Sequence, residues 1–461
     1  MDFSLSDDQL LTRDTVRDFM RTEVRPHVKD WERTDHFPLE AIKKLGAMGC
    51  CGMLTPEAYG GPGLDMISYV LMLEEVARVH AAMSTALSVT NSAVQLPLLA
   101  FATEAQKARY LKPLASGDFL GAFCLTEPAA GSDAAAIQTR AILCSGRSLD
   151  RPFPVAQDES ASPSASESFT SLTSSTSSPS YLLSGTKTWV TNGSHAGVYL
   201  IFAKTDPAAA GKGITAFLVE PTFPGFTIGR HEDKMGQRSS PSVEIILNDC
   251  EVPAANRLGE EGQGLKIALS ALDGGRIGIA AQAVGLAQGA LDESVKFARS
   301  RRAFGKSISE FQAIQFMLAD MHTEIEAARA LLYHAAFLKD RSCGGRSLDQ
   351  PGESVTQGTG GRSFSSDIDQ TGKVGASAPE ELLSSSTSHE SRLTGHASSS
   401  AKLYASEMVN RVVYKAVQIH GSLGYSRESE VERMYRDARV ISIYEGTSEI
   451  QRTIIARDLL R

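Results

Sequence analysis

The order of hydrophobic and polar positions divides this chain into three stretches with different periods. In residues 1–120, apolar residues recur at helical spacing, and Ser6 precedes the first such run in the manner of an N-cap. That run carries an apolar stripe formed by Leu10, Leu11, Val16, Phe19 and Met20. Further helices are predicted at residues 39–48, 69–80, 81–101 and 104–110. We therefore expect an N-terminal all-α domain over residues 1–120.

Between residues 121 and 253 the period changes, and short runs rich in β-branched and aromatic residues appear. Gly, Asn, Asp or Pro bound these runs, as they bound strands, at residues 119–126, 181–183, 188–191, 198–203, 214–220, 226–229 and 243–252. Asn192-Gly193 is a pair favoured in tight hairpins, so a hairpin is expected there. The pattern predicts a middle β-sheet domain over residues 121–253.

Helical spacing returns after Gly262 and continues to the end of the chain. The predicted helices cover residues 265–271, 275–299, 310–339, 401–421 and 450–460, and the long ones have the length of bundle members. The break between the first two places Asp273-Gly274-Gly275-Arg276 at a helix start. A C-terminal four-helix bundle over residues 254–461 completes a multidomain α+β fold.

Two segments interrupt this order. Residues 145–180 and 342–400 are rich in Ser, Thr and Gly, contain few apolar residues and show no usable period. Such segments cannot bury enough apolar area to offset the entropy of ordering, so we expect disordered insertions. The first lies between two predicted strands and the second between two bundle helices.

Composition and charge argue against several classes of function. The net charge of −8 and a pI near 5.8 argue against a nucleic-acid-binding surface. Six cysteines form no CxxC pair and no Cys/His cluster of zinc spacing, so no metal site is predicted. No apolar run approaches the ~20 residues that span a bilayer, and no integral membrane segment is expected. The first ten residues are acidic and helix-like, which fits neither a signal peptide nor a transit peptide.

The run Ile443-Tyr444-Glu445-Gly446-Thr447-Ser448-Glu449 is the strongest candidate for chemistry. Its carboxylate follows an apolar, aromatic stretch, and apolar surroundings raise a carboxylate's pKa and make it a stronger base. The glycine allows a ligand to approach the backbone, and the hydroxyls can bind polar cofactor atoms. Alone, the run is also typical of an ordinary turn before a helix.

Other segments offer binding groups, although each is also typical of ordinary structure. The loop Phe123–Asp133 contains small residues and a spare hydroxyl, and Trp189 and Thr191 point to one face of a strand. Arg276 suits an anion site at a helix start. The remaining candidates are Arg301–Lys306 with Gln312, which suit a nucleotide, and the glycine-broken helix end Gln418–Tyr425.

Taken together, these segments resemble the acyl-CoA dehydrogenase family of flavoenzymes over nearly the whole chain apart from the two insertions. The resemblance rests on 123–133, 189–193, 276–282, 301–305, Gln312, 418–425 and 443–452. It implies an N-terminal helical domain, a barrel-like middle β domain and a C-terminal helical bundle. No GxGxxG motif opens a βαβ unit, which disfavours a Rossmann oxidoreductase.

The resemblance implies that Glu445 removes the α-proton of an acyl-CoA while FAD accepts the β-hydride. Some relatives carry the base at the position that matches Gly275. Glycine has no side chain that could accept a proton, so the resemblance assigns the role of base to Glu445. The residues implied to line the flavin are Phe123, Leu125, Thr126, Ser132, Trp189, Thr191, Thr447, Ser448 and Glu449. The resemblance also implies that each subunit contacts the flavin nucleotide of a neighbouring subunit. The residues implied to do so are Arg301, Phe304, Gln312, Gln418, His420, Gly421 and Ser422. The implied acyl-CoA contacts are Ser132, Asp273, Arg276 and Gly446.

Two departures from the family pattern weaken individual contacts. The usual Gly-Ala-Gly-Ser of the first loop is Ala129-Ala130-Gly131-Ser132 here, and Ser422 replaces the usual second glycine after His420. Both replacements are small, so we expect the loops to tolerate them.

The resemblance also implies partners. We expect a homotetramer built as a dimer of dimers, electron-transfer flavoprotein as the electron acceptor, and the mitochondrial matrix as the compartment, otherwise the cytoplasm. Short-chain and short branched-chain substrates are favoured, with butyryl-, 2-methylbutyryl- and isobutyryl-CoA all open. The alternatives are an acyl-CoA oxidase, which would be marked by an added C-terminal domain, and a catalytically silent scaffold relative.

Overall fold

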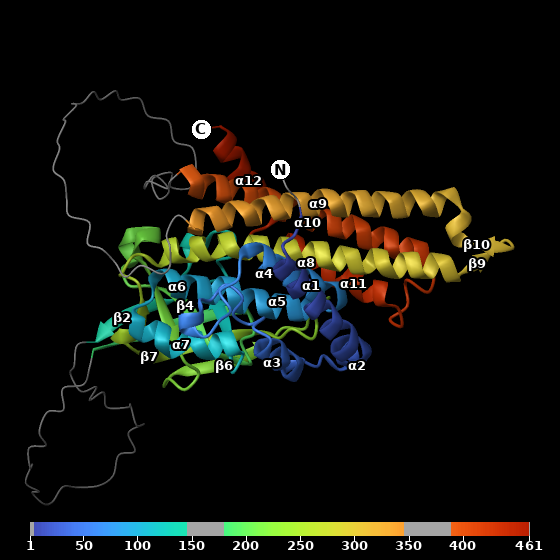
Figure 1. The fold of residues 1–461 in the computed structure, drawn as a ribbon. Helices are drawn as coiled ribbons and strands as arrows, with labels where there is room; N and C mark the ends of the chain where they lie inside the picture. The colour runs from blue at the N-terminus through green and yellow to red at the C-terminus, as the bar shows by residue number, and fades with distance from the viewer. Residues whose placement is uncertain (1–3, 145–178, 345–388, 461) are drawn as a thin grey trace, which may run out of the picture.

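The structure, a computed structural model, describes residues 4–144, 179–344 and 389–460 (Figure 1). Helices form the N-terminal region, a sheet follows in the middle, and helices return in the C-terminal region. The predicted fold class is therefore confirmed. Most of the two predicted insertions, residues 145–178 and 345–388, lies outside the described residues.

The N-terminal helices are α1 (Asp7–Phe19), α2 (Val28–Thr34), α3 (Leu39–Ala47), α4 (Met66–Val79), α5 (Ala81–Ser88), α6 (Leu96–Phe101) and α7 (Glu104–Ser116). The predicted cap of α1 is confirmed, because Ser6 Oγ accepts a hydrogen bond from the backbone N–H of Gln9 at 3.3 Å. Nearly every residue of α4 and α5 is buried. Both helices pack against α8, so this region forms one wall of the C-terminal bundle.

The sheet consists of β1 (Leu120–Cys124), β2 (Arg140–Cys144), β3 (Ser180–Thr191), β4 (Ala196–Lys204), β5 (Ile214–Val219), β6 (Phe226–His231), β7 (Ser242–Pro253) and β8 (Arg257–Leu258). Its order is β6-β7-β3-β2-β4-β5-β8, with β1 pairing parallel to β4. Alternate residues of β4 enter two different cores. Leu200 packs with residues of the surrounding helices, whereas Ile201 packs against β3 and β7, so the curved sheet encloses a core of its own.

The hairpin predicted at Asn192-Gly193 is wrong. Strands β3 and β4 are not hydrogen-bonded neighbours, because β2 lies between them. Asn192 adopts the left-handed conformation typical of such turns, with φ 64°, but its side chain is buried. Its Nδ2 donates to the carbonyl oxygens of Ala86 and Gly121, each at 3.1 Å. The residue therefore joins the sheet to α5 instead of closing a hairpin.

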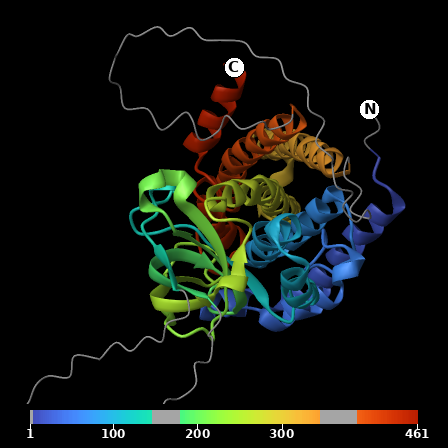
Figure 2. The same cartoon turned by 90° about the vertical axis from the view of Figure 1, so that its left-hand side faces the viewer.

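The C-terminal helices are α8 (Gly264–Ser300), α9 (Gln312–Gly344), α10 (His389–His420), α11 (Glu430–Arg439) and α12 (Ser448–Leu459). Figure 1 shows α8, α9 and α10 side by side along the length of the molecule. In the turned view of Figure 2, the sheet and the N-terminal helices lie next to one another on one side of this bundle. Among the described residues, no helix has the length and apolarity that crossing a membrane requires.

Two predicted boundaries in this region are wrong. Helix α8 runs without a break through Gly274 and Gly275, so Arg276 lies inside a helix of 37 residues and not at a helix start. Helix α10 begins at His389, although residues up to 400 were predicted to be disordered. Thr394, Ser398 and Ser399 are buried there, because small side chains let α10 pack closely on its neighbours.

Six elements were not predicted: α2, α11, β2, β8 and the paired two-residue strands β9 (Arg302–Ala303) and β10 (Lys306–Ser307). Helix α11 carries only three buried apolar residues, Val431, Met434 and Ala438, among many charges. Strand β2 lies next to the Ser-rich segment, and β8 has only two residues. Such weak or short patterns give no periodic signal.

Candidate active site

The loop between α11 and α12 presents the Glu445 side chain to α8. Glu445 and Gly446 are consecutive left-handed residues, with φ 53° and 86°. A Cβ atom placed on Gly275 would lie only 2.6 Å from Glu445 Oε2 and 2.8 Å from its Cδ. The carboxyl group thus occupies the space that the missing side chain of Gly275 leaves free. Oε2 is buried and has no hydrogen-bond partner among the described residues.

Burial raises the pKa of Glu445 to about 7, against the opposing effects of Arg276 and Lys402. A carboxylate with a pKa near neutrality is a stronger base than an exposed one, yet a large fraction of it is ionised at pH 7. Such perturbed groups cluster at functional sites. Glu445 therefore combines an unsatisfied oxygen, a fixed position and a suitable basicity.

Arg276 lies one residue beyond Gly275 on α8 and is nearly fully buried. Its Nη1 contacts Asp273 Oδ1 at 2.6 Å, while its Nε is buried without a partner among the described residues. Arg276 is thus paired with Asp273 and lies close enough to Glu445 to act on the charge of its carboxylate. The anion site proposed for a helix start is not formed, because the N–H groups around Arg276 belong to a continuous helix.

A buried polar network anchors Tyr444, the residue before the carboxylate. The Tyr444 hydroxyl donates to Gln282 Oε1 and accepts from Gln237 Nε2 at 3.2 Å. Gln282 Nε2 in turn donates to Thr85 Oγ1 at 2.6 Å, and Thr85 Oγ1 donates to Gln237 Oε1 at 2.6 Å. The network ties the loop to α5, α8 and the sheet region, so it restricts where Glu445 can move.

Two buried side chains hold the loop from its other side. Lys402 Nζ donates to the carbonyl oxygen of Gly446 at 2.8 Å. Gln451 Nε2 donates to the carbonyl oxygens of Glu445 and Gly446, both at 3.0 Å. No role was predicted for Lys402, Gln451, Gln237 or Thr85. Three of them are polar residues on helices, which usually face solvent, and Gln237 lies in the connection between β6 and β7.

An ion pair supports the predicted flavin loop. Lys187 and Glu127 are both buried, and their charged atoms lie 2.7 Å apart. Glu127 also accepts from Thr139 Oγ1 at 2.5 Å, and the N–H of Thr188 donates to the carbonyl oxygen of Thr126 at 2.9 Å. The loop after β1 is therefore fixed to β3 directly beside Trp189.

The residues around this loop leave a surface that fits a planar cofactor with a polar edge. Trp189 is 58% exposed, and its φ of 60° coincides with a bulge in β3. A Cβ atom on Gly131 would meet nothing within 4 Å, and Ser448 Oγ is buried without a partner among the described residues. Leu125 belongs to the same buried cluster as Ile267 on α8, two turns before Gly275, so the loop and the Glu445 carboxyl group both lie against α8.

The structure does not bring the second predicted group of flavin contacts to this place. Phe304, 95% exposed, and Arg301 follow the end of α8, 26 residues beyond Gly275, or roughly 39 Å along the helix. Gln312, Gln418, Gly421 and Ser422 are also exposed. His420 is half-buried and stacks on Phe297 with ring centres 4.3 Å apart. Within one chain these residues cannot share a site with Trp189.

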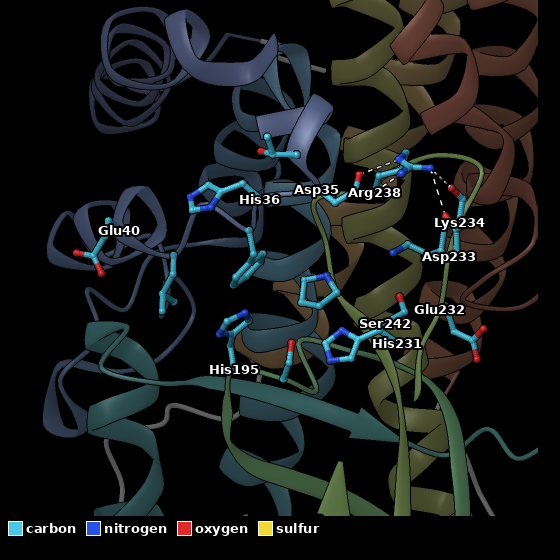
Figure 3. A pocket seen from close by; sticks show the side chains of 15 residues that line it. Asp35, His36, Glu40, His195, His231, Glu232, Asp233, Lys234, Arg238 and Ser242 are labelled. Carbon is cyan, nitrogen blue, oxygen red and sulfur yellow. Dashed lines mark hydrogen bonds and ion pairs between the residues drawn. The ribbon is translucent and has the colours of Figure 1, made fainter. Parts of the chain in front are cut away.

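A separate pocket of about 820 Å³ lies between the α2–α3 connection and the sheet (Figure 3). Arg238 contacts both oxygens of Asp35, at 2.8 and 2.6 Å, and Lys234 Nζ donates to Ser240 O at 2.6 Å. Arg238 and Lys234, the two permanent cations that line this pocket, thus already have hydrogen-bond partners. None of the predicted site residues lines this pocket, so the candidate active site is the one around Glu445.

Comparison with known proteins gives a consistent result along the chain. Models of the acyl-CoA dehydrogenase N-terminal, middle and C-terminal domains match residues 6–118, 158–250, and 262–348 with 382–460. The mouse (Mus musculus) short-chain specific acyl-CoA dehydrogenase is 38% identical over 451 residues, covering 98% of this chain and 90% of the mouse protein.

Two solved structures are similar over essentially the whole chain. Butyryl-CoA dehydrogenase from Megasphaera elsdenii is 37% identical, with a TM-score of 0.80 and full coverage of both chains. An acyl-CoA dehydrogenase from Bacillus anthracis complexed with FAD is 30% identical, with a TM-score of 0.78, covering 99% of this chain and 67% of that one.

Proposed function

The chain belongs to the acyl-CoA dehydrogenase family, and on this premise we propose that it oxidises a short-chain acyl-CoA to the trans-2-enoyl-CoA with Glu445 as general base. Family members are oxidoreductases acting on acyl-CoA, and their cofactor is FAD. The observation that carries the proposal is the Glu445 carboxylate facing Gly275, whose Oε2 is buried without a hydrogen-bond partner among the described residues.

Glu445 supplies the proton acceptor. Its carboxylate takes the α-proton, and the electron pair of that C–H bond forms the Cα=Cβ double bond. When bound, FAD supplies the acceptor for the hydride that leaves Cβ. No described residue accepts a hydrogen bond from the backbone N–H of Glu445, so this donor is available to the thioester oxygen. A donor placed there stabilises the negative charge that develops on that oxygen as the α-proton leaves.

The packing around α8 supports a short acyl chain. A Cβ atom on Gly278 would clash with Ser88 Oγ and lie 2.8 Å from the Tyr69 hydroxyl, so this position is filled. Gly278 lies three residues, roughly 4.5 Å along the helix axis, beyond Gly275. An acyl chain that runs along α8 from the base toward Gly278 would therefore end after a few methylene groups, which suits a butyryl-sized chain, straight or branched.

Tyr69 also lies close enough to respond to the charge of the base. Burial raises the pKa of Tyr69 to about 12, and the charge of Glu445 adds to that rise. The Tyr69 hydroxyl lies 3.3 Å from Ser88 Oγ, and its side chain is fully buried. We assign this pair to the closed end of the acyl site.

We propose electron-transfer flavoprotein as the acceptor and a homo-oligomer, a dimer of dimers, as the working form. The exposed indole of Trp189 beside the flavin loop offers an apolar contact for an electron-transfer partner. The exposed Phe304 and Arg301 lie too far from their own chain's Trp189 to complete one site, and a second copy of the chain would bring them there. Light scattering on the flavin-loaded protein measures the assembly directly.

We propose the mitochondrial matrix as the compartment, since the similar mouse protein is named mitochondrial. Subcellular fractionation with an antibody to the native chain tests this assignment, and recovery in the cytosol alone would contradict it.

The test of the reaction is optical. Purified protein should be yellow, and butyryl-CoA should bleach the flavin absorbance without oxygen. Reoxidation by electron-transfer flavoprotein in preference to oxygen distinguishes a dehydrogenase from an oxidase. A protein that binds no flavin, or whose spectrum no short acyl-CoA changes, would contradict the proposal and favour a scaffold role.

A further inference from the structure

Lys402 is a fully buried lysine whose ammonium group contacts the loop that carries Glu445. It lies on α10, and its Nζ donates to the carbonyl oxygen of Gly446 at 2.8 Å. No carboxylate of the described residues lies within ion-pair distance of it, whereas Lys187, equally buried, is paired with Glu127. Burying a cation without an ion-pair partner is costly, so such groups are concentrated at functional sites.

The charged groups that face Lys402 come from three helices and the Glu445 loop. Burial lowers the pKa of Lys402 to about 8, and the carboxylate of Glu445 is the strongest of the effects that draw it back up. Arg276 on α8 opposes Glu445. Glu407 on α10 and Glu449 on α12 act more weakly, and their side chains are 42% and 80% exposed. Glu445 is thus the main counter-charge of Lys402.

Lys402 is in turn one of the charged groups that act on the Glu445 carboxyl group. The ionisable groups around the Glu445 carboxyl are Arg276 with its partner Asp273, Lys402, and the hydroxyls of Tyr69 and Tyr444. Arg276 directs one Nη to Asp273 at 2.6 Å. Arg276 has the larger effect on the pKa of Glu445, but Lys402 has no such carboxylate partner among the described residues.

Lys402 also restrains the backbone. A non-glycine residue in the left-handed region is strained by about 1 kcal/mol or more, and Glu445 is followed by a second left-handed residue. The bond from Lys402 to Gly446 O, together with the two bonds from Gln451, fixes the carbonyl groups of this turn. Fixing them orients the Glu445 side chain toward Gly275.

We propose that Lys402 is a positioning residue for the general base: its ammonium group locks the Glu445–Gly446 turn and stabilises the ionised form of the Glu445 carboxylate. This inference rests on the proposed function, because it gives Lys402 a role only if Glu445 is the base. Full activity then requires that Glu445 is ionised while Lys402 is protonated. The pH dependence of kcat/KM should then rise through about pH 7 and fall above about pH 8.

The experiment measures kcat/KM for butyryl-CoA across this pH range for flavin-loaded wild type, Lys402→Met and Lys402→Arg. Lys402→Met should move the rising limb up by at least about one pH unit, a loss of about tenfold in kcat/KM on that limb. Lys402→Arg keeps a permanent charge, so its rising limb should stay near that of the wild type and its fall above pH 8 should disappear.

Lys415→Met is the matched control. Lys415 lies on the same helix and is paired with Glu324 at 2.9 Å and Asp320 at 3.2 Å, facing α9 and not the base. The substitution Lys415→Met also removes one charge from α10, and the pH profile of this variant should match that of the wild type. Flavin content and the thermal midpoint, measured on every variant, report structural damage separately from the limb position.

An active Lys402→Met enzyme with an unmoved rising limb would overturn the proposal, even if its thermal midpoint fell. If Lys402→Met does not fold, the comparison of Lys402→Arg with wild type decides, and identical upper limbs would overturn it. A wild type that butyryl-CoA does not bleach would instead contradict the proposed function. The two failures are therefore distinguishable.

Discussion

The carboxyl group of Glu445 fills the space that Gly275 leaves beside α8, with Oε2 2.6 Å from the position that a Gly275 Cβ atom would take. The two residues are 170 positions apart in the sequence, yet the size of each one limits which residue can stand at the other position. A side chain at 275 would displace the carboxylate, and a shorter residue at 445 would leave a buried void beside Arg276. The role proposed for Glu445 thus depends on a glycine inside a long helix.

Gly275→Ala should abolish most of the turnover without unfolding the protein. The added methyl group would push the carboxylate away from the substrate, and misplacing a reacting group by about 1 Å costs on the order of 100-fold in rate. Alanine itself favours the helix by about 1 kcal/mol over glycine. Steady-state kcat and flavin content measure the two effects.

Gly395→Ala is the control for this change, because its Cβ atom would meet nothing nearer than 4.0 Å. It should keep the wild-type kcat. A Gly275→Ala enzyme with wild-type kcat would show that the carboxylate does not need this space.

Tyr444→Phe should lower both stability and kcat. It leaves Gln282 Oε1 and Gln237 Nε2 without their shared hydroxyl, and an unsatisfied buried polar group costs about 1–3 kcal/mol. Urea unfolding measures the loss of free energy, and kcat reports the loosened base. Tyr414→Phe, at an exposed tyrosine of α10, should change neither quantity. Unchanged unfolding of Tyr444→Phe would mean that the network does not hold the loop.

Lys187→Met should destabilise the fold and release flavin. It leaves Glu127 buried and unpaired, and breaking one partner of a buried ion pair typically costs about 3–5 kcal/mol. The double change Lys187→Met with Glu127→Gln should recover part of that loss, since no charge then stays buried. Flavin content and urea midpoints of both variants test this, and additive losses would argue against the pairing.

The same pair predicts a loss of stability in acid. Burial alone would raise the pKa of Glu127, but Lys187, Thr139 and the Gln138 N–H together lower it below its usual value of 4.5. A depressed carboxylate pKa stabilises the fold fully above the unfolded value and loses that contribution as pH falls through the folded value. Thermal midpoints of wild type should therefore drop below about pH 4.5 more steeply than those of Glu127→Gln.

Tyr69→Leu should shift the preferred acyl chain toward longer substrates. Removing the ring and hydroxyl opens the closed end of the acyl site, and one methylene in such a pocket is worth about 1–3 kcal/mol. The ratio of kcat/KM for hexanoyl-CoA over butyryl-CoA should rise about tenfold or more. Leu71→Met, a change of similar volume on α4, should leave the ratio unchanged. An unaltered ratio in Tyr69→Leu would place the end of the pocket elsewhere.

Local sequence signals predicted much of this fold and singled out Glu445 as the candidate base, because they are carried by neighbouring residues. The N-cap at Ser6 and the run around Glu445 are of this kind. The continuity of α8 was not predictable, since two glycines favour a break and only packing against Glu445 and Leu96 explains them. The start of α10 was missed for a related reason, because its serines and threonines are stabilised by close contact between helices.

Lys402 and Asn192 show the same limit at the level of single residues. A lysine in a helix usually faces solvent, and an Asn-Gly pair usually closes a hairpin. Here the first is buried against Gly446 and the second joins the sheet to α5. Only the tertiary arrangement shows which polar side chains are buried and what they contact.

The most direct test of Glu445 as general base compares wild type with Glu445→Gln under anaerobic butyryl-CoA. Glutamine keeps the shape of the side chain but cannot accept the proton, so both proteins should be yellow and only the wild type should bleach. Bleaching of Glu445→Gln at the wild-type rate would contradict the assignment of the base.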